Sequence, residues 1–445
     1  MNIENLRESY AIDPKYYDRY EVSRGLRKKD GTGVLVGITR IGDVRGYILE
    51  EGVKVSVPGK LIYRGINVES IVDACLEEKR FGFEETAYLL LFGELPTREQ
   101  LSDFTNLLHQ RQVLPNNFAE DVILSAPSKN IMNKLAQCAL ACYGYEENPD
   151  SVDLEVVLNQ CIDLIARFPV MIAYAFQAKQ RYYEGKSLFI HVPDENLSMA
   201  ENFLYMLRAD GKYTPTEAAI LDLSLILHAE HGGGNNSSFT VHVVSSTGTD
   251  TYSAIAAAIG SLKGPKHGGA NSAVLSMMED IKANVKNWSD RDELRLYLEK
   301  ILRKEAGNGS GLIYGMGHAV YTVNDPRSEV LKKKAVVLAK EKGQDEEMNL
   351  YLLIEELAPM VFADVKGSDK VICANVDFFS GFIYQMLDIP EELCTPIFAM
   401  SRIAGWCAHR IDEIVNGGKI IRPAYRNASK RRDYTPISER SNTNG

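Results

Sequence analysis

The chain has 445 residues, of which 45% are hydrophobic and 25% charged, so it is long enough for one large core or two unequal cores. Its formal net charge of −10 argues against a general nucleic-acid partner, because binding to phosphates needs a basic surface. The first residues lack the apolar segment of a secretory signal, and we find no apolar run near the roughly 18 residues that cross a bilayer. The seven cysteines are odd in number and include no C-x-x-C pair. We therefore expect a cytoplasmic protein with reduced thiols and no membrane partner.

The predicted elements begin with short β-prone runs broken by glycines at residues 34–57, which indicate a small meander of strands. Helical signals dominate after it. Thr97 with Gln100, and Thr214 with Glu217, form the pattern of a capping box before apolar stretches. The segment after Thr214 and the segment 251–262 are apolar nearly all round, as in buried helices. The fold class we predict is therefore mainly α, with several helical layers and a small N-terminal β meander.

A more charged stretch at about 279–370 contains amphipathic patterns that are typical of surface helices. We expect it to form a smaller helical domain (276–382) inserted into a large helical domain (1–275 and 383–445). The polar end of the chain, from about Arg426, has few apolar anchors, so we expect a mobile tail with a solvated basic cluster.

Five of the eight histidines fall within the 91 residues from His228 to His318, which marks this region for the functional search. The first motif, LHAEHGGGNNSS, ends a predicted buried helix, and His228 and His231 would share one helix face. A metal site of His228, His231 and His242 near Glu230 is one interpretation, although no H-E-x-x-H spacing or flanking cysteine supports it. A histidine that caps a core helix is the other.

His267 stands in the turn GPKHGGANSAV, directly before a helical run whose dipole would keep its imidazole neutral. A neutral imidazole at this place can donate to a developing enolate oxygen, although a structural turn histidine fits as well. His318 follows a Gly-x-Gly in GMGHAVYTVNDPRSEV, and Asp325-Pro326-Arg327 reads as an N-cap, an N1 proline and a first-turn arginine. Arg327 near the free N–H groups of a helix start could bind a carboxylate, or it could form a surface ion pair.

Asp377 lies among the apolar residues of CANVDFFSGFIYQML, where desolvation would raise its pKa and suit a general base. The alternative is a helix N-cap. Arg402 lies in an otherwise apolar helix and needs an anionic partner, from the protein or from a ligand. With Arg422 in IIRPAYRN, these residues suit a small polycarboxylate substrate and carbonyl or enolate chemistry. The sequence shows no fingerprint of a hydride cofactor, no phosphate loop and no convincing metal site.

Six segments in this order, HAEHGGGN, GPKHGGAN, GMGHAVYTVNDPR, NVDFFSG, SRIAGW and RP, resemble the citrate synthase family. The resemblance extends over roughly residues 45–425 and implies an almost all-α homodimer whose site closes on oxaloacetate between a large and a small domain. It implies that Asp377 deprotonates the acyl-CoA methyl group, that His267 stabilises the enolate, and that His318 polarises the oxaloacetate carbonyl. The thioester product would then be hydrolysed.

The same resemblance implies that His231, Arg327 and Arg402 hold the oxaloacetate carboxylates and that Arg422 reaches in from the second subunit. It places CoA along a set of mainly backbone positions: Leu312, Ile313, Gly315, Gly317, Lys370 and Asn375. Acetyl-CoA would be a co-substrate, and we expect no tightly bound cofactor and no metal. Glu230 departs from the aspartate of many relatives, and GGGNN is longer than in many bacterial relatives, which leaves the local backbone open.

Three alternatives remain at this point. A 2-methylcitrate synthase would use propionyl-CoA on the same fold, and the motifs do not separate the two. A metal-dependent hydrolase would use the three histidines of the first motif. A catalytically inactive binding paralogue is disfavoured because all three catalytic residues are present.

Overall fold

The computed structural model describes residues 3–51, 53–367 and 371–440, and it separates the chain into two compact units. The core unit comprises Thr39–Ile420, and the terminal unit combines the residues through Ile38 with those from Ile421 onward. The predicted division into a large domain (1–275 and 383–445) and a small domain (276–382) stays a prediction.

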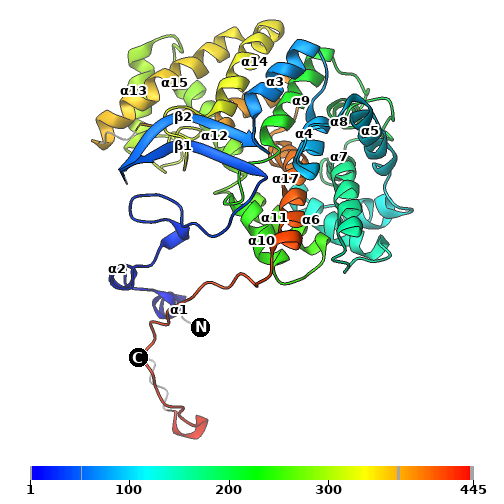
Figure 1. Cartoon of the computed structure of the whole chain (residues 1–445). Coiled ribbons are helices and arrows are strands. Elements are labelled where there is room, and N and C mark those ends of the chain that lie inside the picture. The colour runs from blue at the N-terminus through cyan, green and yellow to red at the C-terminus, as the bar shows by residue number, and fades with distance from the viewer. Residues whose placement is uncertain (1–2, 52, 368–370, 441–445) are drawn as a thin grey trace. The chain divides into compact units, whose positions relative to one another are not determined.

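The core unit is built almost entirely of helices (Figure 1). Its α-helices up to the centre of the chain are α3 (Val68–Glu78), α4 (Phe83–Phe92), α5 (Arg98–Arg111), α6 (Ile131–Ala141), α7 (Leu154–Glu184), α8 (Met199–Leu207), α9 (Pro215–His228) and α10 (Asn236–Ser245). The later ones are α11 (Thr251–Lys263), α12 (Ala270–Asn284), α13 (Arg291–Leu302), α14 (Pro326–Lys342), α15 (Asp345–Lys366), α16 (Val376–Met386) and α17 (Cys394–Asn416). Short helical turns are η2 (Ala119–Leu124), η3 (Cys142–Tyr145) and η4 (Glu391–Leu393). The mainly α prediction is thereby confirmed.

The terminal unit contains two short α-helices, α1 (Ile3–Tyr10) and α2 (Lys15–Arg19), and the turns η1 (Arg24–Leu26) and η5 (Ile437–Glu439). Within this unit, Arg426 places its guanidinium 5.2 Å from the centre of the Tyr20 ring. No α-helix lies in the described residues after Asn416, in agreement with the polar composition of that segment.

Local capping signals set several helix starts. The predicted capping boxes are both present: Thr97 and Gln100 cap the N-terminus of α5, and Thr214 and Glu217 cap that of α9. In each, the threonine hydroxyl accepts from the N3 backbone and the N3 side chain accepts from the N-cap backbone, so two orphan donors are satisfied at once.

The three strands lie later in the chain than predicted. They are β1 (Gly42–Glu50), β2 (Val53–Tyr63) and β3 (Ile66–Asn67), in antiparallel order β1-β2-β3. Residues 34–38 form no strand, and Leu35 and Ile38 are exposed. A β-prone run needs a partner strand to pair with, and the partners here are the two longer runs on either side of the turn near Glu51.

The β1–β2 hairpin lies against the loop that precedes α14 (Figure 1). Its register shifts between Arg45 and Tyr47, and a Cβ at the intervening Gly46 would lie 2.5 Å from the carbonyl oxygen of Val320. The N–H of Gly59 also donates to Asn324 Oδ1 at 2.9 Å. The glycines therefore let the hairpin approach the loop that contains His318.

Two long helices dominate the interior. Helix α7 is long and apolar enough to cross a membrane, which corrects the expectation that the chain lacks such a run. Its most apolar 18-residue stretch is 78% buried within the protein, as expected of a core helix. Helix α17 runs through the same interior and packs against α4, α7, α9, α10 and α11 (Figure 1).

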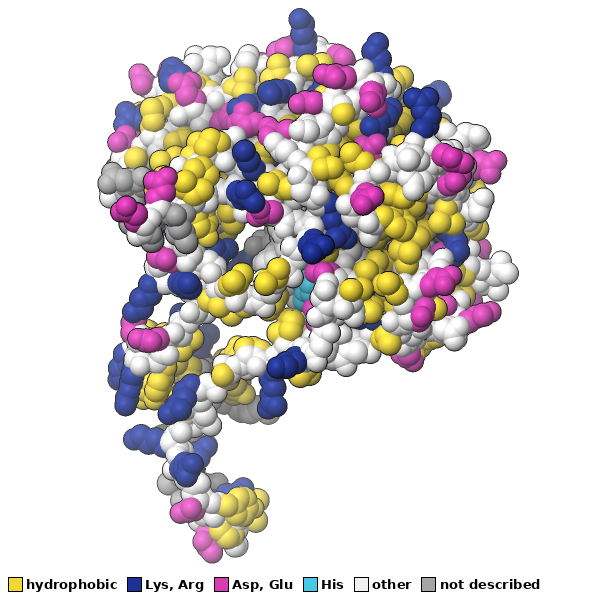
Figure 2. All heavy atoms as spheres, in the orientation of Figure 1, with side chains coloured by type: hydrophobic (Ala, Val, Ile, Leu, Met, Phe, Trp, Pro, Cys, Tyr) yellow, Lys and Arg dark blue, Asp and Glu magenta, His cyan; other side chains and the backbone are white. Residues whose placement is uncertain are grey.

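The surface mixes charged and hydrophobic side chains. Figure 2 shows acidic and basic side chains interspersed with hydrophobic ones over the face that it draws. All seven cysteines are free, and six of them are buried.

Candidate active site

Arg402 is the centre of the candidate site because its charge is buried without a full set of partners. It lies in the middle of α17 with 0% exposure. Its Nε donates to the carbonyl oxygen of His228 at 2.7 Å, but both terminal nitrogens are buried without a hydrogen-bond partner. Burial lowers the pKa of Arg402 to about 10. A guanidinium in this state can form two parallel hydrogen bonds to a carboxylate.

His231 offers a second unsatisfied donor or acceptor. Helix α9 ends at His228, so His231 lies in the turn beyond it rather than on the same helix face, contrary to the sequence prediction. The side chain is buried and its Nε2 has no hydrogen-bond partner. Burial, followed by the charge of Arg327, lowers the pKa of His231 well below its usual value, so the ring is neutral.

His228 is a core histidine. Its Nδ1 lies 2.7 Å from the carbonyl oxygen of Ser224, one turn earlier in α9, and burial lowers its pKa to about 3. In the part of the chain that the structure describes, the donor atoms of His228, His231 and His242 do not gather into a group that could hold a metal ion. The metal site proposed on these three histidines is therefore wrong.

His318 has a tautomer that the backbone selects. Its Nδ1 accepts from the N–H groups of Val320 and Tyr321, both at 3.1 Å. The hydrogen of a neutral ring therefore lies on Nε2, which makes His318 a donor on that side. The ring stacks on Tyr321 with centroids 4.6 Å apart and meets the ring of His231 edge-on at 5.2 Å.

Arg327 is held by the predicted N-cap. Asp325 accepts from the backbone N–H of Arg327 at 3.0 Å, and Pro326 opens α14, as the sequence predicts. The same carboxylate also accepts from Nε and Nη2 of Arg327, at 3.0 and 2.7 Å. Arg327 is 3% exposed, so the surface ion pair is excluded, and its guanidinium has a fixed orientation.

Asp377 is not the N-cap of α16. Asn375 has that role, because its Oδ1 accepts from the N–H of Asp377 at 3.0 Å. Desolvation raises the pKa of Asp377 to about 6, with a smaller opposing effect of Arg327. A carboxylate with such a pKa is ionised near neutral pH and basic enough to accept a proton from carbon.

A short backbone pairing connects the segments of His318 and Asp377. The N–H of Gly317 donates to the carbonyl oxygen of Cys373 at 2.7 Å, and the N–H of Asn375 donates to that of Gly315 at 2.8 Å. The Asn375 side chain adds a bond to the carbonyl oxygen of Gly317 at 2.9 Å. These bonds fix the two catalytic candidates relative to each other.

His267 is neutral, as predicted, but for a different main reason. Burial, and then the charge of Arg402, lowers its pKa to about 4, whereas the prediction relied on the dipole of the following helix. Its Nε2 lies 3.0 Å from the Ser237 hydroxyl. That hydroxyl has a single hydrogen and also lies 2.9 Å from Asn235 Oδ1. When the hydrogen points to Nε2 instead, the ring carries its own hydrogen on Nδ1 and is a donor there.

Sequence reasoning missed three residues that organise the site. The guanidinium of Arg402 lies 4.7 Å from the centre of the Phe398 ring, which also contacts the rings of His228 and His267. Ser237 links His267 to the indole N–H of Trp406. Phe398 precedes Arg402 by four residues, so helical spacing could have identified it.

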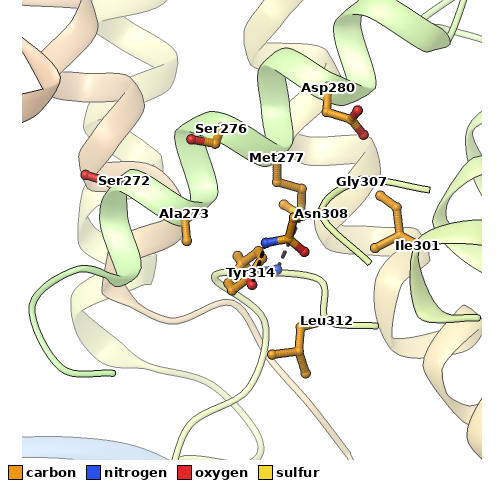
Figure 3. Close-up of a pocket in the computed structure, with 10 residues that line it drawn as sticks. All are labelled: Ser272, Ala273, Ser276, Met277, Asp280, Ile301, Gly307, Asn308, Leu312 and Tyr314. Carbon is orange, nitrogen blue, oxygen red and sulfur yellow. Dashed lines mark hydrogen bonds between the residues drawn. The ribbon is translucent and has the colours of Figure 1, made fainter. Parts of the chain in front are cut away.

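One of the positions predicted for CoA, Leu312, lines a pocket of about 220 Å³ between α12 and the loop that precedes Gly315 (Figure 3). Its lining includes Leu312 and Tyr314, and Asn308 donates to the Tyr314 hydroxyl at 2.9 Å. Leu312 is exposed and Ile313 is buried. Gly315 and Gly317 have φ of 76° and 96°, a conformation that favours glycine. Lys370 lies outside the described residues.

Arg422 belongs to the terminal unit, where its side chain is exposed. Its role in the site of a second subunit stays a prediction. The core unit, by contrast, contributes the buried arginines Arg327 and Arg402, the neutral histidines His231 and His267, and the basic carboxylate of Asp377. This set can bind a dicarboxylate, polarise a carbonyl group and remove a proton from carbon.

Comparisons with known proteins agree with this chemistry. Residues 30–424 match the family model described as citrate synthase, C-terminal domain. The chain is 34% identical to a citrate synthase of Haloferax volcanii, over 94% of this chain and 99% of that protein. It is 35% identical to 2-methylcitrate synthase 1 of Corynebacterium glutamicum, over 86% and 92%.

Solved structures show the same similarity. The crystal structure of citrate synthase from Pyrobaculum aerophilum is 31% identical, with a TM-score of 0.73 over 92% of this chain and 94% of that one. A citrate synthase from Thermoplasma acidophilum, solved as a ternary complex with carboxymethyl coenzyme A and oxaloacetate, is 25% identical, with a TM-score of 0.76 over 94% and 99%.

Proposed function

Since the chain belongs to the citrate synthase family, we propose that it condenses oxaloacetate with acetyl-CoA and water to give citrate and CoA. The observation that carries the proposal is the pair of buried, unpartnered terminal nitrogens of Arg402. They lie in a site that also contains neutral His231 and a carboxyl group, Asp377, whose pKa is about 6.

The residues divide the reaction between them. Asp377 removes a proton from the methyl group of acetyl-CoA, and neutral His267 donates a hydrogen bond to the enolate oxygen that forms. The Nε2–H of His318 polarises the ketone of oxaloacetate, which the enolate carbon attacks. Water then cleaves the thioester of the condensation product and releases the CoA thiol.

The substrate carboxylates are assigned to Arg402, Arg327 and His231. Arg327 is already oriented by Asp325, whereas the terminal nitrogens of Arg402 have no hydrogen-bond partner and are available to an anion. We place part of the acyl-CoA in the pocket beside Leu312 and Tyr314. The ternary complex of the Thermoplasma acidophilum relative supports both small-molecule substrates.

We further propose a homodimer in which Arg422 completes the site of the neighbouring subunit. We place the protein in the cytoplasm, a proposal that its free cysteines support.

Use of propionyl-CoA is a second candidate activity, supported by the similarity to a 2-methylcitrate synthase. One assay tests both. Purified protein is given oxaloacetate with acetyl-CoA or with propionyl-CoA, and thiol release is followed by a chromogenic thiol reagent. Omission of oxaloacetate shows background hydrolysis. Release from acetyl-CoA that depends on oxaloacetate supports the proposal, a higher kcat/KM for propionyl-CoA selects the second candidate, and release from neither refutes both.

A further inference from the structure

A continuous chain of hydrogen bonds extends behind the candidate site from Glu413 to Glu230. Glu413 Oε2 lies 2.8 Å from His242 Nδ1, and His242 Nε2 lies 3.0 Å from His409 Nδ1. His409 Nε2 in turn lies 3.0 Å from Glu230 Oε1. The chain joins α10 to α17 and ends in the turn that contains His231.

The number of hydrogens needed along this chain of hydrogen bonds determines the protonation state of its four side chains. A carboxylate only accepts, so the nitrogen of each imidazole that faces a carboxylate must carry a hydrogen. The bond between the two rings needs a third hydrogen. Two neutral imidazoles carry only two, and without the third the facing nitrogens would direct lone pairs at each other across 3.0 Å. With both end carboxyl groups ionised, one ring of the pair is therefore an imidazolium.

The carboxylates at the two ends favour this extra proton. Burial tends to raise the pKa of Glu230, but His409 and Arg402 outweigh it and lower that pKa, so Glu230 is ionised. Burial, and then the charge of His409, lowers the pKa of His242, in agreement with one cation for the pair rather than two.

The other charged and titratable groups around this chain of hydrogen bonds lie on α17 and on or directly after β2. Asp412 on α17 attracts a positive charge on His242, and Arg402 on α17 stabilises the negative charge of Glu230. Arg410 interacts with Glu413, while Tyr63 and Arg64 on and beside β2 interact with Glu230. Asp412 and Glu413 thus favour a positive charge on His242, whereas Arg402 acts at the Glu230 end of the chain of bonds.

The inner end of the chain is rigid. His409 and Glu230 are both 0% exposed, so water does not replace their bond. Glu230 Oε1 also accepts from the N–H of Gly232, across the turn that presents His231. A Cβ at Gly405 would lie 2.4 Å from Glu230 Oε2, and one at Gly42 would lie 2.8 Å from Oε1. The absence of side chains at Gly42 and Gly405 thus makes room for the Glu230 carboxyl group where it lies.

We propose that His242 and His409 share one extra proton and that this protonated pair is a positioning element for oxaloacetate. His409 fixes Glu230 through a hydrogen bond, and Glu230 fixes the backbone at Gly232 through another. That backbone positions His231 for the substrate. The inference rests on the proposed function for the identity of that substrate. No residue of the pair touches the reacting atoms, so the effect falls on binding rather than on chemistry.

The sign of the pH dependence follows from the proton count. The positioning is present while the pair holds its extra proton, and it is lost as the pH rises and the two rings become neutral. The KM of wild-type protein for oxaloacetate should therefore rise by about fivefold on the alkaline side, the size of one weakened hydrogen bond. The KM for acetyl-CoA and kcat should change by less than about twofold.

Two variants of the pair separate positioning from titration. In His409→Gln the amide nitrogen can replace Nε2 as the donor to Glu230, but nothing faces His242, so the KM for oxaloacetate should stay low and lose its alkaline rise. His409→Leu removes the only side-chain partner of the Glu230 carboxylate among the described residues, and the KM should rise at least tenfold at every pH. Glu413→Gln, at the outer end of the chain of bonds, removes one charge that stabilises the extra proton, so the rise of the KM for oxaloacetate should move to lower pH. His109→Gln in α5, outside the chain of bonds, is the matched control and should leave the profile unchanged.

The proton itself has a spectroscopic signature that does not depend on activity. In protein labelled with ¹⁵N-histidine, a far-downfield proton bonded to an imidazole nitrogen should appear near neutral pH and disappear in His242→Gln. Its absence in well-folded wild-type protein would overturn the inference, as would its appearance only after treatment with a chelator, which would mean that a metal ion takes its place. An alkaline KM profile that His409→Gln leaves unchanged would also overturn it. A wild-type protein that shows the proton but releases no CoA thiol would instead refute the proposed function.

Discussion

Replacement of Arg402 by lysine tests the site most directly. Arg402 is fully buried, and its two terminal nitrogens have no partner until an anion arrives. Lysine keeps the charge but offers one ammonium in place of a planar fork. A hydrogen bond to a charged group contributes about 1.5–3 kcal/mol, so loss of one of the two bonds should raise the KM for oxaloacetate by about 10- to 150-fold. Desolvation of the buried lysine would lower its pKa and add to this loss.

Thermal unfolding with and without oxaloacetate gives a second measure of the same interaction. A ligand at about 100 times its Kd stabilises by about 2.7 kcal/mol. With an unfolding entropy of about 2.1 cal/mol/K per residue over 445 residues, the wild-type Tm should rise by about 3 °C. At the same oxaloacetate concentration, Arg402→Lys should show less than about half of this rise.

The matched control for this experiment is Arg410→Lys. Arg410 lies on the same helix, is equally buried and donates to the carbonyl oxygen of Thr249 at 2.6 Å, away from the candidate site. This variant should lose stability but keep its KM and its Tm rise with oxaloacetate. If Arg402→Lys kept the wild-type KM within about twofold, the assignment of Arg402 to a substrate carboxylate would be wrong.

The remaining predictions concern the base, the second arginine and the assembly. Asp377→Asn should lower kcat by about two orders of magnitude or more while oxaloacetate still binds, and near-normal turnover of the variant would contradict the role of Asp377 as the base. Wild-type turnover should fall as the pH drops below about 6, because only the ionised carboxylate accepts a proton. Arg327→Lys should weaken oxaloacetate binding more than twofold, measured by titration, because it also loses the paired bonds to Asp325; an unchanged affinity would exclude a bidentate role. When inactive Asp377→Asn and Arg422→Ala are mixed after reversible dissociation, shared sites should restore a sizeable fraction of activity, and no recovery in mixed dimers confirmed by mass would show that Arg422 does not serve a neighbouring subunit.

Local sequence signals predicted the features that depend on neighbours in the chain. The capping boxes at Thr97 and Thr214 and the Asp325-Pro326 helix start depend on residues within three positions of each other, and all are present. The strands were misplaced because β pairing depends on a partner that a single run does not contain. Likewise, Asn375 and Asp377 both suit an N-cap, and the sequence alone could not choose between them.

Contacts between distant segments were beyond sequence reasoning. The bond between Glu230 and His409 joins residues 179 positions apart, and no local pattern connects the two. The neutrality of His267 was predicted from its helix, yet its main cause is burial followed by Arg402, which is far away in the chain. Motifs thus identified the chemical groups, while packing of α17 against α9 and α10 determined what surrounds them.

The two buried arginines of the site differ in a way that bears on how the substrate is selected. Arg327 pairs with Asp325 through two hydrogen bonds, so its charge is compensated before any ligand binds. Arg402 has only the carbonyl oxygen of His228 as a hydrogen-bond partner, and its terminal nitrogens are unsatisfied. A buried unsatisfied donor costs free energy that an anion of the right shape recovers on binding. A neutral molecule of the same size would leave that cost in place, so Arg402 favours a carboxylate over an uncharged analogue, whereas Arg327 contributes a preoriented contact.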